Sequence, residues 1–254
     1  MKQINKYIQE RLHINKDTGN HSYNYHPKTR DELEKLLDKL IIERGNDADL
    51  NDIDTSEIKD MYKLFYTSDF NGDISNWDVS NVEFMSFMFK HSKFNGDISK
   101  WDVSKVEDMG HMFAYSSFNG DISEWNVSNV KTMISMFYDS KFTGENGDIS
   151  KWDVSNVEDM GSMFGYSKFN GDISKWDVSK VENMSSMFNY SSFTGENGDI
   201  SNWDVRNVET MKSMFCGSSF NGDISKWNVS NVKYMKYMFG ESPLEKNPPK
   251  WYKK

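Results

Sequence analysis

The chain has 254 residues, a formal net charge of −9 at pH 7 and a sequence pI near 5.1. A protein that follows a phosphate backbone needs a basic face, and no run of Lys and Arg provides one, so the composition argues against nucleic-acid binding. The single cysteine, Cys216, excludes an internal disulfide. No stretch approaches the roughly 20 apolar residues that span a bilayer, so we expect no membrane insertion.

The N-terminal segment, residues 1–27, is polar and receives no structural assignment. It has neither the apolar core nor the small-residue cleavage site of a signal peptide, so the sequence as written predicts a cytoplasmic protein. A leader removed earlier would instead allow a cell-surface location, and the location therefore stays open.

Residues 28–45 are predicted to form a capping helix. Thr29 and Glu32 have the spacing of a capping box, and Gly45 is typical of a helix end. Because the open end of a repeat array invites aggregation, we expect this helix to cover the first repeat. Its predicted buried face consists of the apolar residues at helical spacing, namely Leu33, Leu36, Leu37, Leu40 and Ile41.

The segment 46–244 repeats one short unit, which reads F-N-G-D-I-S-x-W-D-V-S-N-V-x-x-M-x-x-M-F-x-x-S-x. The tryptophans of this array are Trp77, Trp101, Trp125, Trp152, Trp176, Trp203 and Trp227. Their spacing is 24 or 27 residues, and each longer spacing contains the same three-residue insertion, in 142–147 and in 193–198. A degenerate copy with Ile53 in the tryptophan position precedes them, which gives about eight repeats.

Each unit combines two local periods. Residues 74–79 are β-branched and aromatic and follow an Asn-Gly turn, which predicts a short strand. The next apolar residues are spaced i, i+3, i+6 and i+7, which predicts a short helix that begins at a capping box formed by Ser80 and Glu83. The predicted inward positions of this helix are Val82, Met85, Met88 and Phe89.

These elements together predict an α/β solenoid. We expect a leucine-rich-repeat-like coil of about eight 24–27-residue repeats, each with a short strand and a short helix, and a helical cap at the N-terminal end. Residues 245–254 are predicted to form a C-terminal cap or tail, in which Pro248 and Pro249 remove ladder donors and Trp251 covers the last coil.

The repeated unit resembles a known family. The run D-I-S-x-W-D-V-S-N-V-x-x-M-x-x-M-F is similar to the bacterial surface protein repeat of the BspA-like leucine-rich-repeat surface proteins, and to a domain of unknown function abundant in mycoplasma surface lipoproteins. The resemblance covers roughly residues 46–244. It implies a leucine-rich-repeat-like coil and a role in adhesion or interaction, and it implies no catalytic residues. The chain lacks the leader, lipobox and wall anchor of surface members, which leaves room for an intracellular or phage-encoded relative.

One aspartate recurs in every full copy, directly after the Gly that precedes Ile-Ser. Stacked carboxylates repel one another, so something must offset the repulsion. We favour an Asx-type hydrogen bond in which each carboxylate accepts from the backbone of its own turn; the alternative is a calcium ladder, as in glycine- and aspartate-rich β-helix repeats. The column consists of Asp73, Asp97, Asp121, Asp148, Asp172, Asp199 and Asp223. A second acidic column follows the tryptophans and contains Asn126 and Asn228, so it needs a hydrogen bond rather than a charge.

The sequence carries no catalytic, cofactor-binding or metal-binding signature. The histidines have no metal-ligand spacing, there is no Gly-rich phosphate loop, and Cys216 stands at a position that varies between copies. Methionine and tryptophan recur at inward spacing, which favours core packing over a soft-metal or sugar site. We therefore predict a protein that is not an enzyme and that needs no cofactor.

Positions that vary between copies carry the information about a partner, because the recurring positions are used for packing. Grouped aromatic residues at variable positions are typical of protein-binding hot spots, and the alternative is that these rings merely pack over neighbouring coils. The tyrosine column is interrupted by Asp139. The candidate partner-binding residues are Phe84, Phe87, His91, His111, Tyr115, Tyr166 and Tyr190.

These observations favour a non-catalytic repeat protein that binds a macromolecular partner, with a protein as the favoured partner. One alternative is a phage or virion component that self-associates through its weakly covered C-terminal end. Another is a carbohydrate-binding surface formed by the regular Asp and Ser columns.

Overall fold

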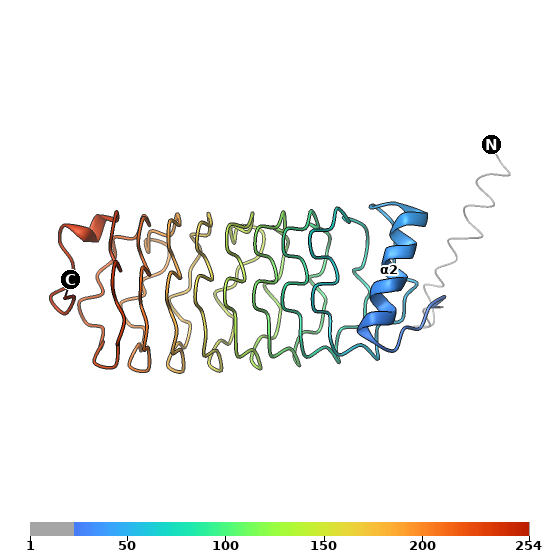
Figure 1. The fold of residues 1–254 in the computed structure, drawn as a ribbon. Coiled ribbons are helices and arrows are strands. Elements are labelled where there is room, and N and C mark those ends of the chain that lie inside the picture. Colours follow the sequence, from blue (N-terminus) through green and yellow to red (C-terminus); the bar gives the residue numbers. More distant parts are fainter. Residues whose placement is uncertain (1–22, 254) are drawn as a thin grey trace.

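A computed structural model describes residues 23–253, so most of the unassigned segment 1–27 lies outside the described residues. Figure 1 shows a stack of coils with helix α2 at one end and the C-terminus at the other. Between residues 23 and 253 the only helices are α2, Arg30–Arg44, and the single 3₁₀ turn η1, Pro243–Glu245. Neither is long and apolar enough to cross a membrane.

Helix α2 confirms the predicted capping helix. The N–H of Glu32 donates to the Thr29 hydroxyl at 3.3 Å, and the Glu32 carboxylate accepts the N–H of Lys28, one residue before the N-cap, at 2.7 Å, so the reciprocal bond of the capping box is shifted by one residue. Gly45 ends the helix with φ 92° and donates its N–H to the Ile41 carbonyl oxygen at 2.9 Å. The buried face consists of Leu33, Leu37 and Leu40, and Leu36 and Ile41 pack at its edge.

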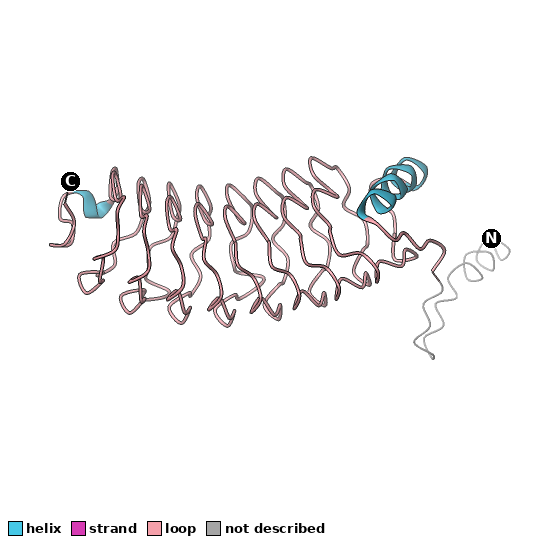
Figure 2. Cartoon of the chain, turned by 60° about the horizontal axis from the view of Figure 1, so that its bottom comes forward, coloured by secondary structure: helices cyan, strands magenta, loops and turns pink. Residues whose placement is uncertain are grey.

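Residues 46–242 contain neither helix nor strand, so the predicted strand-plus-helix unit of an α/β, leucine-rich-repeat-like coil is wrong (Figure 2). The predicted helical segment 82–89 and the residues after it form a chain of tight turns. Three successive turns between residues 85 and 92 are closed by an N–H that donates to the carbonyl oxygen three residues earlier, at 3.1–3.2 Å. Phe87 and His91 have φ values of 61° and 58°, which an α-helix cannot contain.

Neighbouring coils are joined by backbone hydrogen bonds at alternate residues of this turn chain. The N–H groups of Met85, Phe87, Phe89 and His91 each donate to a carbonyl oxygen of the next coil, and all four bonds are 2.9 Å long. One isolated parallel bridge per coil, such as that between Phe84 and Asp108, marks the same contact. The turn chain buries Val82, Met85, Met88 and Phe89 as a helix would, which explains the incorrect helix prediction.

The predicted capping box at Ser80 is also absent. The N–H and the hydroxyl of Ser80 both donate to Asp78 Oδ1, at 3.0 and 2.7 Å, and Glu83 pairs with Lys59 of the preceding coil. These contacts close an Asx turn and cross-link two coils, and neither caps a helix.

The core is a set of stacked columns that run the length of the coil, as the repeat predicted. Each array tryptophan is at most 5% exposed and donates its indole N–H to a carbonyl oxygen of the preceding coil at 3.0–3.2 Å. Rings of the main phenylalanine column are stacked with centroids 5.4–6.0 Å apart. This column consists of Phe65, Phe89, Phe113, Phe137, Phe164, Phe188, Phe215 and Phe239.

Trp251 continues the tryptophan column into the C-terminal tail. It lies 24 residues after Trp227, its ring centroid is 6.5 Å from that of Trp227, and its indole N–H donates to the Ile224 carbonyl oxygen at 3.0 Å. The tail therefore starts a further coil in register, which the 24-residue spacing of Trp251 could have indicated.

Candidate functional site: an aromatic ladder along the coil

The variable positions of the turn chain include two columns of residues in the left-handed region. Their φ values lie between 47° and 66° in every coil. The first column consists of Lys63, Phe87, His111, Ser135, Ser162, Ser186, Ser213 and Tyr237. The second consists of Thr67, His91, Tyr115, Asp139, Tyr166, Tyr190, Gly217 and Glu241. Since non-glycine residues adopt this conformation at a cost, the repeating turns fix where these side chains emerge.

Six aromatic side chains form a continuous row on the surface, which we call the tyrosine ladder. Their ring centroids are 6.1, 4.5, 5.3, 5.4 and 5.2 Å apart in order along the coil. The ladder consists of Tyr66, His91, Tyr115, Tyr138, Tyr166 and Tyr190. Four of its side chains, those of Tyr66, Tyr115, Tyr166 and Tyr190, are 40–47% exposed, so the row lies on the surface and is not part of the core.

Tyr138 is the residue that sequence reasoning missed. In this coil Asp139 occupies the position that holds Tyr115 and Tyr166 in the adjacent coils, so the sequence predicted an interruption of the tyrosine column. Tyr138 stands one residue earlier, and its ring lies between those of Tyr115 and Tyr166. Burial beside these neighbours raises the pKa of Tyr138 to about 12. The column itself is interrupted by Asp139, as the sequence indicated, but Tyr138 fills the interruption from the adjacent position and the row of rings is continuous.

Two glycines make room for rings of the ladder. A Cβ on Gly165 would lie 2.9 Å from the Tyr138 ring, and a Cβ on Gly217 would lie 2.4 Å from the Tyr190 ring. Beyond Gly217 the Tyr190 hydroxyl donates to the Glu241 carboxylate at 3.0 Å, two coils further on. A glycine at these variable positions could have indicated that an aromatic side chain of the preceding coil lies over it along the surface.

A shorter row lies beside the N-terminal half of the ladder. The Phe87 ring stacks on His111 at 4.4 Å and meets Tyr62 edge-on at 5.7 Å. The Lys90 ammonium connects the two rows, because it lies 5.0 Å from the Phe87 centroid and 5.8 Å from that of Tyr115. Burial, and secondly the charge of Lys90, lowers the pKa of His111.

The candidate partner-binding residues thus fall into three places. His91, Tyr115, Tyr166 and Tyr190 belong to the ladder, and Phe87 and His111 belong to the shorter row. Phe84 is 43% exposed and makes no ring contact with any residue between 23 and 253, so the structure does not bring it into either row.

The aspartate column forms the Asx turns that the sequence favoured. In all seven copies the carboxylate accepts the N–H of the serine two residues later, at 2.8–2.9 Å. The backbone hydrogen bond from Ser99 lowers the pKa of Asp97, and that from Ser174 lowers the pKa of Asp172. Asn126 and Asn228 accept the same type of bond, at 3.2 Å. Residues 23–253 contain no group of three or more His, Cys, Asp or Glu that could hold a metal ion, and calcium binding stays an alternative prediction.

The comparisons with known proteins place the chain in a family. The family model described as "Mycoplasma protein of unknown function, DUF285" matches residues 33–146, 117–215 and 140–251. The chain belongs to this family. The overlapping matches reflect the internal repetition, and they confirm the resemblance to the domain found in mycoplasma proteins. No curated protein and no solved structure matches the chain.

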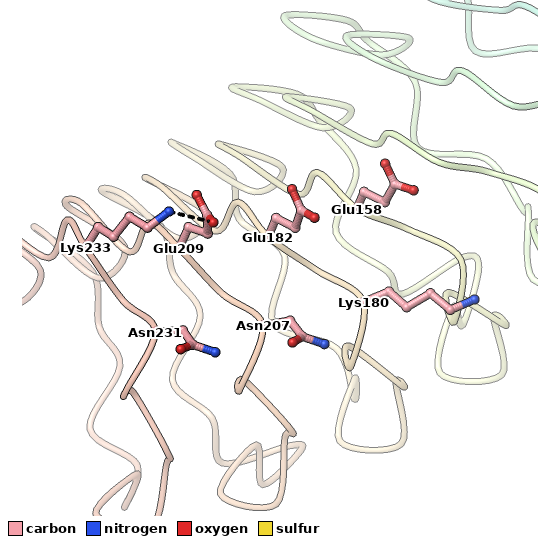
Figure 3. Close-up of a pocket in the computed structure, with 7 residues that line it drawn as sticks. All are labelled: Glu158, Lys180, Glu182, Asn207, Glu209, Asn231 and Lys233. Carbon is pink, nitrogen blue, oxygen red and sulfur yellow. Dashed lines mark hydrogen bonds and ion pairs between the residues drawn. The ribbon is translucent and has the colours of Figure 1, made fainter.

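This DUF285 chain also has a polar groove of about 650 Å³ (Figure 3). It is lined by Glu158, Lys180, Glu182, Asn207, Glu209, Asn231 and Lys233. Lys233 pairs with Glu209 at 2.7 Å, and the amides of Asn207 and Asn231 donate to carbonyl oxygens of the preceding coil. These side chains cross-link coils, and the groove brings together no nucleophile and base. Burial raises the pKa of the Cys216 thiol, the opposite of what activates a nucleophile.

Proposed function

We propose that the protein is a non-catalytic repeat scaffold that binds a protein partner, as an adhesion or interaction module, and that the tyrosine ladder is the binding surface. The supporting observation is the unbroken row of six aromatic rings with four tyrosines 40–47% exposed. Tyrosine is enriched in hot spots because it combines a large apolar ring with a polar hydroxyl.

Preorganisation supports the same proposal. Each ladder ring is held by rings of the neighbouring coils, and the backbone beneath is fixed by inter-coil hydrogen bonds of 2.7–2.9 Å from His91, Tyr115, Tyr166 and Tyr190. Side chains that are ordered before binding lose less conformational entropy in the complex, so more of the contact energy appears as affinity. Lys63 and Lys90 at one end of the ladder add positive charge beside the rings.

A quantitative pull-down from the native source or its host tests the proposal. We compare the wild type with a triple variant, Tyr115→Ser, Tyr166→Ser and Tyr190→Ser, since serine already occupies left-handed positions of the neighbouring column. The matched control is Lys151→Ser, Lys175→Ser and Lys226→Ser, at exposed positions before the tryptophans. We expect at least ten-fold loss of partner capture in the tyrosine variant alone, with cooperative melting retained in all three proteins.

The other outcomes separate the alternatives. Equal capture by all three proteins would contradict the ladder as the binding surface, and capture of a glycan would favour the regular Asp and Ser columns. Capture of only the protein itself would favour a phage or virion assembly role. We also propose a relationship to leucine-rich-repeat surface proteins, which is supported by the repeat sequence and not by strands or helices within the coil.

A further inference from the structure

The last complete coil leaves a row of backbone N–H groups without partners. In the preceding coil the N–H groups of Met211, Ser213 and Phe215 donate to carbonyl oxygens of the last coil, at 2.8–3.0 Å. The equivalent N–H groups of Met235, Tyr237 and Phe239 donate to no carbonyl oxygen of any residue between 23 and 253. Because the repeat is regular, these three N–H groups point along the coil axis, away from the preceding coil.

The two ends of the coil are covered differently (Figure 1). Helix α2 packs against the first coil, and Arg30 Nε donates to the Tyr62 carbonyl oxygen at 2.6 Å. At the C-terminal end the cover is partial: the Glu245 carboxylate accepts the N–H of Glu241 at 3.0 Å, which satisfies the fourth donor of the row. The N–H groups of Met235, which is partly exposed, and Tyr237, which is exposed, form an open edge for hydrogen bonding, whereas Phe239 is only 1% exposed.

An apolar groove of about 290 Å³ lies beside this edge. Its walls include Tyr237, Phe239 and Tyr252, and the Tyr252 ring meets Phe239 edge-on at 5.0 Å. Tyr237 is 57% exposed. The groove therefore offers a place for one apolar side chain next to the open donors.

The end is basic in an acidic protein. Lys233 is paired with Glu209, and residues 234–253 contain four lysines and two glutamates, a net charge of +2, whereas the whole chain carries −9. Lys236 and Glu245 line the groove, where the Glu245 carboxylate accepts the Glu241 N–H, and Lys246, Lys250 and Lys253 are on the tail. A partner segment with carboxylate side chains is therefore complementary to this end.

We propose that the C-terminal end binds an acidic, extended peptide segment of another protein, whose backbone carbonyl groups accept from Met235 and Tyr237 and whose apolar side chain enters the groove. The other end shows that an extended segment can dock on this coil, since Tyr25 forms a parallel bridge with Ile53 and accepts the N–H of Asp54 at 2.9 Å. Addition of an extended segment to an open edge is a known mode of peptide recognition.

A second copy fits this end poorly. Two C-terminal ends that meet would bring N–H groups opposite N–H groups, which cannot bond. Head-to-tail stacking would need the carbonyl edge of the first coil, which is covered by α2 and Arg30. This site lies at the end of the coil, and the hydrogen bond from Tyr190 to Glu241 links it to the tyrosine ladder, so its test leaves Tyr190 unchanged.

Selection of random nine-residue peptides displayed on phage against the full chain tests the proposal. We expect enriched peptides to be acidic with at least one aromatic or aliphatic residue. Synthetic copies should bind at least ten-fold more weakly to Met235→Pro, which removes one donor, and to Lys236→Glu. The matched control Lys212→Glu changes the same position one coil earlier, and it and a double variant, Tyr115→Ser and Tyr166→Ser, should bind as the wild type does.

The Met235→Pro substitution could loosen the last coil, and amide hydrogen exchange of the unsubstituted protein therefore provides a second measurement. In the wild-type complex, exchange at Met235 and Tyr237 should slow at least ten-fold. Failure to enrich any peptide, unchanged exchange at these amides, or equal binding to Lys236→Glu would overturn the proposal. Self-association abolished by Lys236→Glu would overturn it in favour of a second copy.

Discussion

Single residues explain how a column of seven carboxylates is tolerated. Each aspartate accepts a hydrogen bond from its own turn, so the turn gains a fixed geometry while the charges repel one another only across solvent. The bond needs an acceptor rather than a charge, because Asn126 and Asn228 serve equally in the second column.

Substitutions of Asp97 test this explanation. We expect Asp97→Ala to lower the free energy of unfolding by about 1 kcal/mol, the size of one net hydrogen bond, because the N–H of Ser99 loses its acceptor. Asp97→Asn should stay within about 0.5 kcal/mol of wild type. Urea denaturation measures both. An Asn variant as unstable as the Ala variant would show that the charge itself is needed and would favour the calcium alternative.

The titration of His111 tests the contact between the two rows. Burial and the Lys90 charge disfavour the protonated ring, so its NMR midpoint should lie below the ordinary value near 6.5. Because the folded pKa is lowered, the stability contribution of this histidine is present above the ordinary pKa and is lost as pH falls from that value through the folded pKa. Lys90→Met should raise the midpoint, whereas Lys105→Met should not. Identical midpoints in all three proteins would exclude the influence of Lys90.

At the scale of the local element, the turn chain depends on left-handed residues that are mostly not glycine. Ser162 has φ 57° and makes no side-chain hydrogen bond within residues 23–253, so only its conformation is at issue. The left-handed conformation costs an L-residue roughly 1–2 kcal/mol, which exceeds the extra chain entropy of glycine.

Ser162→Gly should therefore raise the free energy of unfolding by about 0.5–1 kcal/mol. Ser162→Ala retains the Cβ and serves as the control, with an expected change within about 0.5 kcal/mol. Chemical denaturation of the two variants side by side gives the comparison. A glycine variant less stable than the alanine variant would mean that the left-handed turn is not strained.

The same element marks the limit of sequence reasoning. The repeat length, the capping helix, the inward columns and the Asx turns followed from spacing and residue type. The turn chain did not, because inward positions 82, 85, 88 and 89 suit a helix and a chain of turns equally, and positive φ at Phe87 or His91 leaves no trace in residue type. Tyr138 was missed because the search followed one column, while its ring reaches the ladder from the adjacent position.

At the scale of the whole molecule, stability is shared between neighbouring coils. Each coil contacts the coils before and after it through ring stacking, indole hydrogen bonds and alternate backbone bonds. Such a stack behaves as a one-dimensional array, in which an interior defect interrupts the coupling and a terminal defect only frays the end.

Alanine at an interior and at a terminal tryptophan should separate these two effects. Trp125 is 3% exposed and bonds to Ile98, so Trp125→Ala should lower stability by roughly 3–5 kcal/mol and broaden or split the thermal transition. Trp251 lies on the last coil, so Trp251→Ala should speed amide exchange in residues 227–253 while the main transition stays within a few degrees of wild type. Calorimetry and hydrogen exchange give both quantities. Equal loss of the main transition in the two variants would show that the coil unfolds as one indivisible unit.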